Sequence, residues 1–226
     1  MPRYYHAEIR VDGMLWYHFK AQPSSQYYIS QIPPVIHNYG LTLALAGFIV
    51  DPDTGYASKF NVKKYKRPLE VYRRYGVYAY PPLIFKAVLG EVLMAGNNEG
   101  LLMIRGQSRL AYPFFTKNVV LMPGSMLRTL VISEDPLPDK MVINIGAKRM
   151  GVLLVRLTSI KPQILEQKQV THPFNTDDVV NVYNYATIMT HEAGNIGMFG
   201  VAERALKYQV RVGRRLYEVV LPVIRR

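Results

Sequence analysis

The chain has 226 residues, no cysteine and a formal net charge of +12 at neutral pH. The absence of thiols excludes disulfides, thiolate metal sites and a cysteine nucleophile. A pI near 9.8 favours a polyanionic partner, of which nucleic acid is the commonest. A membrane surface is the competing partner, but no apolar run reaches the roughly 18 residues that span a bilayer. We therefore expect no membrane partner and a cytoplasmic protein.

The first part of the chain predicts a strand, a second extended segment and one helix. Tyr4–Val11 alternates and is rich in strand-forming residues, and Asp12-Gly13 follows it as a turn. Met14–Lys20 predicts a second extended run. Ile36–Val50 is the best helix candidate. Asn38 is the expected cap, because its side chain can accept a hydrogen bond from the first-turn amides.

Cations and aromatic residues are concentrated in Tyr56–Tyr80. The cations are Lys59, Lys63, Lys64, Lys66, Arg67, Arg73 and Arg74, and the tyrosines among them include Tyr65, Tyr72 and Tyr75. Cations bind phosphates and exposed rings stack on unpaired bases, so this composition suits single-stranded RNA. A solvated basic loop with half-buried tyrosines is the alternative. The alternation of Val71-Tyr72 and Val77-Tyr78 favours a long hairpin over a helix.

Strands dominate the remainder of the chain. They are predicted at residues 101–105, 126–133, 141–145, 152–157, 205–212 and 216–223, the last two forming a hairpin across Gly213-Arg214-Arg215. The pattern indicates an α+β protein with a ferredoxin-like or RNA-recognition-motif core, long strand-rich insertions and a C-terminal β-hairpin. No linker separates two clear domains, so we expect a single domain over residues 1–226.

Four blocks of the sequence resemble one known family. They are Ile36–Leu45 (IHNYGLTLAL), Leu121–Met126 (LMPGSM), Ile143–Gly151 (INIGAKRMG) and His172–Asp178 (HPFNTDD). In their order and spacing they resemble the small backbone subunit of type I-D CRISPR interference (Cascade) complexes, the "Cas five" or "Csc one" family of RAMP-superfamily proteins. Two residues depart from the family's last motif: Phe174 replaces leucine and Thr176 replaces proline.

The resemblance implies a non-catalytic subunit of an antiviral ribonucleoprotein complex. It implies a core like an RNA-recognition motif with a thumb-like insertion, placed here at residues 51–82. The subunit would hold the 5′ handle of the CRISPR RNA and nucleate assembly. Its protein partners would be the large subunit and the backbone subunits, with target DNA near the protospacer-adjacent motif as a further partner. No cofactor and no metal are expected.

Three groups of residues are the candidate RNA contacts. His37, Asn38 and Tyr39 lie at a predicted helix start, where backbone amides attract phosphate, or they form an ordinary cap. The thumb-like segment contributes Lys63, Lys64, Lys66, Arg67, Tyr72, Arg73 and Arg74. Lys148 and Arg149 lie between two glycines that allow the backbone to approach a phosphate, or in a simple hairpin turn with exposed charges.

A metal-free endoribonuclease that processes CRISPR repeat RNA is the alternative function. Such an enzyme places a histidine, a lysine and a tyrosine near the attacking 2′-hydroxyl. The five histidines are His6, His18, His37, His172 and His191, and no two of them form a recognisable sequence pair. Scattered structural or surface histidines are the competing interpretation. Gly194-x-x-Gly197-x-x-Gly200 matches neither the dinucleotide fingerprint nor a phosphate loop.

Overall fold

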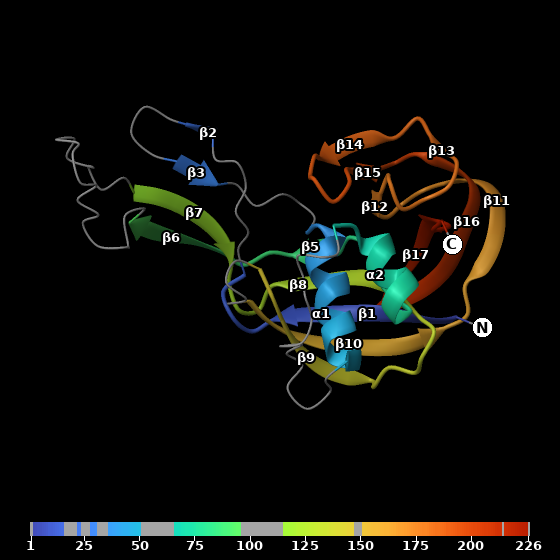
Figure 1. The fold of residues 1–226 in the computed structure, drawn as a ribbon, viewed down its shortest axis with the longest axis horizontal. Coiled ribbons are helices and arrows are strands. Elements are labelled where there is room, and N and C mark those ends of the chain that lie inside the picture. The colour runs from blue at the N-terminus through green and yellow to red at the C-terminus, as the bar shows by residue number, and fades with distance from the viewer. Residues whose placement is uncertain are drawn as a thin grey trace.

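The fold is strand-rich, with two short helices in the described part of the chain (Figure 1). The computed structural model describes residues 2–15, 22–23, 28–30, 36–50, 66–95, 115–146, 151–213 and 215–225. The predicted α+β class is therefore confirmed at the level of a strand-rich fold with helices. Neither described helix is long and apolar enough to cross a membrane.

An antiparallel sheet with the first strand at its centre forms the core. Its strands are β1 (Arg3–Val11), β8 (Met126–Ser133), β10 (Gly151–Ile160), β9 (Lys140–Ile145), β4 (Val77–Ala79) and β5 (Leu83–Lys86). β8 and β10 flank β1, β9 lies beyond β10, and β4 and β5 both pair with β8. The strands predicted at 4–11, 126–133, 141–145 and 152–157 are confirmed.

The two faces of this sheet are chemically different because successive side chains of a strand point to opposite sides. In β1, Tyr5, Ala7, Ile9 and Val11 are buried on the inner face, which packs against α1 (Asn38–Val50). Figure 1 shows α1 and α2 lying across this sheet. The helix predicted over residues 36–50 is thus confirmed, and it is anchored by its apolar contacts with the sheet.

The hairpin predicted for the basic segment is wrong for residues 68–75, which form α2 (Pro68–Tyr75). Pro68 lies in the first turn of α2, where a backbone N–H would have no partner within the helix, so its absence costs nothing. The Glu70 Oε2 accepts hydrogen bonds from the backbone N–H groups of Lys66 (2.8 Å) and Arg67 (3.3 Å). Gly76 ends the helix with φ +67°. Residues 51–65 of the predicted thumb-like insertion lie outside the described residues.

A second sheet covers one end of the outer face of the first. It contains β11 (Gln163–Gln169), β16 (Val201–Val212), β17 (Arg215–Pro222) and β13 (Val182–Tyr183). β16 and β17 confirm the predicted C-terminal hairpin, with Gly213 in the turn at φ +61°. A second apolar cluster joins the sheets, because Leu130 and Ile132 of β8 belong to it together with Val219 and Leu221 of β17.

Two smaller sheets complete the described chain. One contains β12 (Phe174–Asn175), β15 (Ile196–Met198) and β14 (Ala186–Met189); the other contains β2 (Gln22–Pro23), β3 (Tyr28–Ser30), β7 (Phe115–Leu121) and β6 (Leu89–Ala95). β6 and β7 extend away from the central sheet (Figure 1). The strand predicted at 101–105 lies outside the described residues.

Candidate functional site

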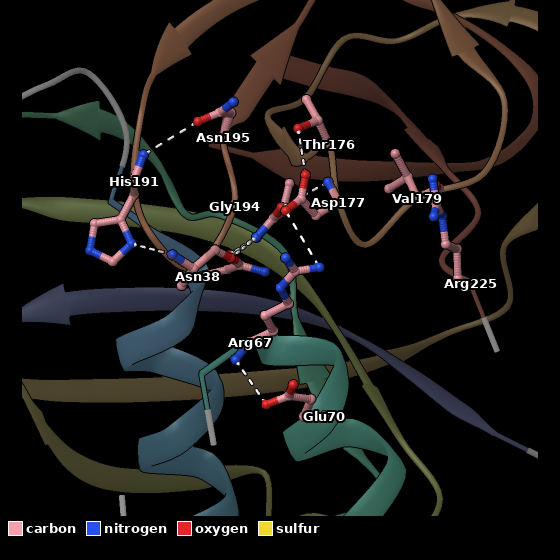
Figure 2. Close-up of polar contacts among 12 residues, drawn as sticks. Asn38, Arg67, Glu70, Thr176, Asp177, Val179, His191, Gly194, Asn195 and Arg225 are labelled. Carbon is pink, nitrogen blue, oxygen red and sulfur yellow. Dashed lines mark hydrogen bonds and ion pairs between the residues drawn. The ribbon is translucent and has the colours of Figure 1, made fainter. Parts of the chain in front are cut away.

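Three distant segments of the chain meet at the start of α1, as Figure 2 shows. They are His37-Asn38, the loop around Asn175–Asp178, and the turn at His191–Asn195. Two of these segments belong to blocks that carry the family resemblance. Hydrogen bonds over 137 to 157 residues of sequence separation hold them together. The fold therefore builds one site from residues that no local pattern connects.

His37, and not Asn38, caps α1. The Nδ1 of His37 accepts a hydrogen bond from the backbone N–H of Tyr39 at 3.1 Å, and its Nε2 donates to the carbonyl oxygen of Gly194 at 2.8 Å. These two bonds require the neutral imidazole with its proton on Nε2. Burial lowers the pKa of His37 to about 4, so the ring stays neutral at physiological pH.

Asn38 lies at the centre of a buried polar network. Its Nδ2 donates to the hydroxyl of Tyr78 (3.0 Å), and to the Oδ2 of Asp178 (3.3 Å). Its Oδ1 accepts from the Nδ2 of Asn175 (3.2 Å). The Tyr78 hydroxyl in turn donates to the same Oδ2 of Asp178 (3.0 Å). All four side chains are fully buried, so in this structure Asn38 is not presented to a partner.

Asp178 is a buried acid with an incomplete set of partners. Burial raises its pKa to about 6, and the hydrogen bonds from Tyr78 and Asn38 oppose that rise. Its Oδ1 has no hydrogen-bond partner among the described residues. The network therefore carries a carboxyl group whose charge is weakly favoured at neutral pH.

The turn at Gly194 fits this network only without a side chain. Gly194 has φ +111°, and a Cβ atom there would overlap the side chain of Asn175. Asn175 also donates to the carbonyl oxygen of Ala193 at 2.9 Å, which fixes the turn. A glycine at this position therefore allows the chain to pass directly over the asparagine.

The exposed edge of the site is cationic. Arg67 and Asp177 form an ion pair across it, with 3.8 Å between Nη1 and Oδ2. Lys66, Arg73 and Arg74 are exposed on or beside α2. Exposed guanidinium and ammonium groups can contact phosphates, and α2 holds them in fixed relative positions.

The other residues predicted to contact RNA do not lie on this exposed edge or are outside the described residues. Tyr72 is buried on the inner side of α2, with its ring in edge-to-face contact with Tyr78 at 6.4 Å between centroids. It is therefore a core residue in this structure, and Tyr39 is half-buried. Lys63, Lys64, Lys148 and Arg149 lie outside the described residues.

The structure pairs histidines that the sequence leaves apart. The rings of His37 and His191 lie 4.4 Å apart between centroids. The Nδ1 of exposed His191 accepts from the backbone N–H of Ala193 at 3.0 Å, which places the proton of the neutral ring on Nε2. His6 and His172 are buried, and burial lowers the pKa of each to about 4. The described residues hold no cluster of three metal-ligating side chains.

Sequence reasoning missed the network because its members are far apart. The sequence predicts Tyr78 in a hairpin, and Asn175 and Asp178 lie in the block HPFNTDD with no pattern that links them to Asn38. The one available signal was that block itself, together with the asparagine at the start of α1.

Comparisons with known proteins agree with the resemblance of the four blocks. The family model for type I-D CRISPR-associated protein Cas5/Csc1 matches residues 2–211. A comparison with curated proteins found no match. The family match covers all the segments that meet at the site, including the turn at His191–Asn195, which the four blocks do not contain.

Proposed function

The chain belongs to the type I-D CRISPR-associated Cas5/Csc1 family, and from this premise we propose that it binds the 5′ handle of the CRISPR RNA and nucleates assembly of the interference complex. Membership of the family assigns the chain to CRISPR-based antiviral defence. The large subunit, the backbone subunits and target DNA near the protospacer-adjacent motif are the partners that this role implies.

The exposed cations on and beside α2 are the observation that carries the proposal. Lys66, Arg67, Arg73 and Arg74 lie within nine residues and are all exposed. Arg67 reaches the loop of Asp177, so this surface adjoins the site where the family-like blocks meet. Each phosphate contact releases counterions, which gives affinity without sequence specificity.

The central sheet has an arrangement that suits the core implied by the family resemblance. It is antiparallel, has β1 at its centre and places both described helices near its inner face. We propose that it is the counterpart of an RNA-recognition-motif core. In the described residues, the histidines give less support to cleavage. Both nitrogens of His37 are engaged, and His6 and His172 are buried.

The test is co-expression of the chain with a tagged large subunit, the backbone subunit and a repeat-spacer RNA. Reversing the charge of Arg73 and Arg74 to glutamate should lower the RNA recovered in the complex about tenfold, because two phosphate contacts are lost. The matched control is Lys161→Glu with Lys168→Glu, two exposed cations away from α2.

Three results would speak against the proposal. Equal RNA loss in the control pair would mean that net charge, not α2, binds the RNA. Failure of the wild-type chain to co-purify would remove the assembly role. Shortening of repeat RNA by the isolated chain in EDTA, abolished by His191→Ala, would favour the metal-free endoribonuclease.

A further inference from the structure

The outer face of the central sheet is divided into a covered part and an open part. Side chains of β1 on this face are Tyr4, His6, Glu8 and Arg10. Tyr4 packs against the second apolar cluster, and His6 contacts Tyr208 of β16 through a hydrogen bond of 3.3 Å. The second sheet therefore covers the part of the face at Tyr4 and His6. Arg10 is exposed and Glu8 is half-buried, so the face opens beyond His6.

Two cross-strand rows form the open part, which we call the basic sheet face. The first row places Arg10 between Met126 and Leu154, and pairs Leu154 with Val142. The second row consists of Arg128, Glu8, Arg156 and Lys140. Both rows contribute to a cavity of about 620 Å³, whose described lining residues are Glu8, Arg10, Met126, Lys140, Met141, Val142, Leu154, Val155 and Arg156.

The basic sheet face carries an excess of positive charge over an apolar floor. Lys140 and Arg156 are exposed and adjacent in the register, with Glu8 as the one carboxylate in their row. Arg10 is the partly neutralised cation, since its Nε lies 3.0 Å from Asp12. Val142 is 54% exposed, so its aliphatic side chain presents apolar surface to solvent beside Leu154.

Arg128 adds a held cation at the margin of this face. Its guanidinium lies 4.9 Å from the ring centroid of Tyr217 and 5.8 Å from that of Phe85. Its Nε has no hydrogen-bond acceptor within the described part of the chain. A fixed cation and an apolar floor together favour a ligand that offers both carboxylates and aliphatic side chains.

We propose that the basic sheet face docks an acidic amphipathic helix of a partner protein. The apolar stripe of such a helix would cover Met126, Leu154 and Val142, as α1 covers the inner face of the same sheet. Flanking carboxylates would meet Lys140 and Arg156. Unpaired RNA fits less well, because none of the described residues that line the cavity is aromatic, and the rings of Tyr217 and Phe85 at its margin already contact the Arg128 guanidinium.

Fluorescence anisotropy with three labelled probes tests this docking on the isolated chain. The probes are an 18-residue helical peptide with a leucine stripe flanked by glutamates, the same peptide with glutamines, and an 18-nucleotide uridine RNA. The glutamate peptide should bind at least tenfold more tightly than the glutamine peptide. Lys140→Glu with Arg156→Glu should weaken it about tenfold, and Val142→Asp should weaken it several-fold, because all three side chains are exposed and line the cavity.

Lys161→Glu with Lys168→Glu is the control for net charge and should leave the affinity for the glutamate peptide within twofold. Equal affinity for the two peptides, no binding of either, or equal weakening by the control pair would overturn the proposal. A further contradicting result has two parts: the RNA displaces the glutamate peptide, and Lys140→Glu with Arg156→Glu abolishes RNA binding. That result would assign the face to nucleic acid. Each readout is independent of the RNA-binding role proposed for α2.

Discussion

His37 immediately precedes the buried asparagine to which Asp178 is hydrogen-bonded, and burial shifts the pKa values of His37 and Asp178 in opposite directions. The pKa of His37 falls to about 4 and that of Asp178 rises to about 6. For His37 the unfolded chain binds more protons between pH 6.5 and 4, so stability is lost as pH falls through this window. For Asp178 the folded chain binds more protons between pH 4 and 6, so stability is lost as pH rises. The two effects partly cancel near pH 5.

The substitution His37→Asn isolates the contribution of His37 to the pH dependence of stability. An asparagine can still cap α1, but it carries no titratable group. Lowering the pKa of His37 from 6.5 to about 4 corresponds to roughly 3 kcal/mol, so between pH 7 and 4.5 the variant should lose about 2–3 kcal/mol less stability than the wild type. Urea unfolding followed by circular dichroism at both pH values measures the difference. A wild-type pH dependence in His37→Asn would contradict the assignment.

At the scale of elements, α2 is a helix in a segment whose alternating residues predicted a hairpin. The alternation of Val71-Tyr72 and Val77-Tyr78 predicted a hairpin, yet only Val77–Ala79 forms a strand. Pro68, Glu70 and Gly76 are residues typical of a helix start, a capping acid and a helix end. Val71 and Tyr72 are buried side by side because they form the inner stripe of a helix eight residues long. So short a helix offers too little periodicity to distinguish it from a strand.

Replacing Gly76 tests how much the glycine at the end of α2 contributes to stability. Gly76 and Gly213 both have left-handed backbones, with φ +67° and +61°, but a Cβ atom at Gly76 would lie 3.0 Å from the Cβ of Glu134, whereas Gly213 faces open space. Gly213→Ala should cost about 1–2 kcal/mol, the strain of the left-handed conformation alone. Gly76→Ala should cost measurably more, because Glu134 must also move. Thermal unfolding of both variants gives the comparison, and equal losses would show that Glu134 adapts without cost.

Elements with strong local signals were predictable, and long-range contacts were not. Four strands of the central sheet and the C-terminal hairpin follow from alternation and a glycine turn, and α1 follows from an apolar run of helical length. The Asn38 network joins side chains 40 to 140 residues apart, and no periodicity in the sequence indicates such pairing. Polar residues such as Asn38, Asn175 and Asp178 are rarely buried unless their hydrogen bonds are satisfied, and the partners that satisfy them here are distant in the sequence.

At the scale of the whole molecule, the net charge of +12 poses an alternative to any local RNA site. A diffuse positive field attracts RNA over a Debye length and should not distinguish one exposed cation from another. A local site predicts the opposite, because only cations that contact phosphates release counterions. The salt dependence of RNA binding therefore separates the two explanations.

Arg73→Ala with Arg74→Ala should reduce the slope of log K against log salt by about 1.4 for single-stranded RNA, since each lost phosphate contact removes roughly 0.7. Lys161→Ala with Lys168→Ala changes the net charge equally and should leave the slope unchanged within about 0.3. Binding of a repeat-derived RNA between about 50 and 200 mM salt gives both slopes. Equal reductions in the two pairs would mean that the charge of the whole molecule governs binding, and the cations of α2 would then have no special role.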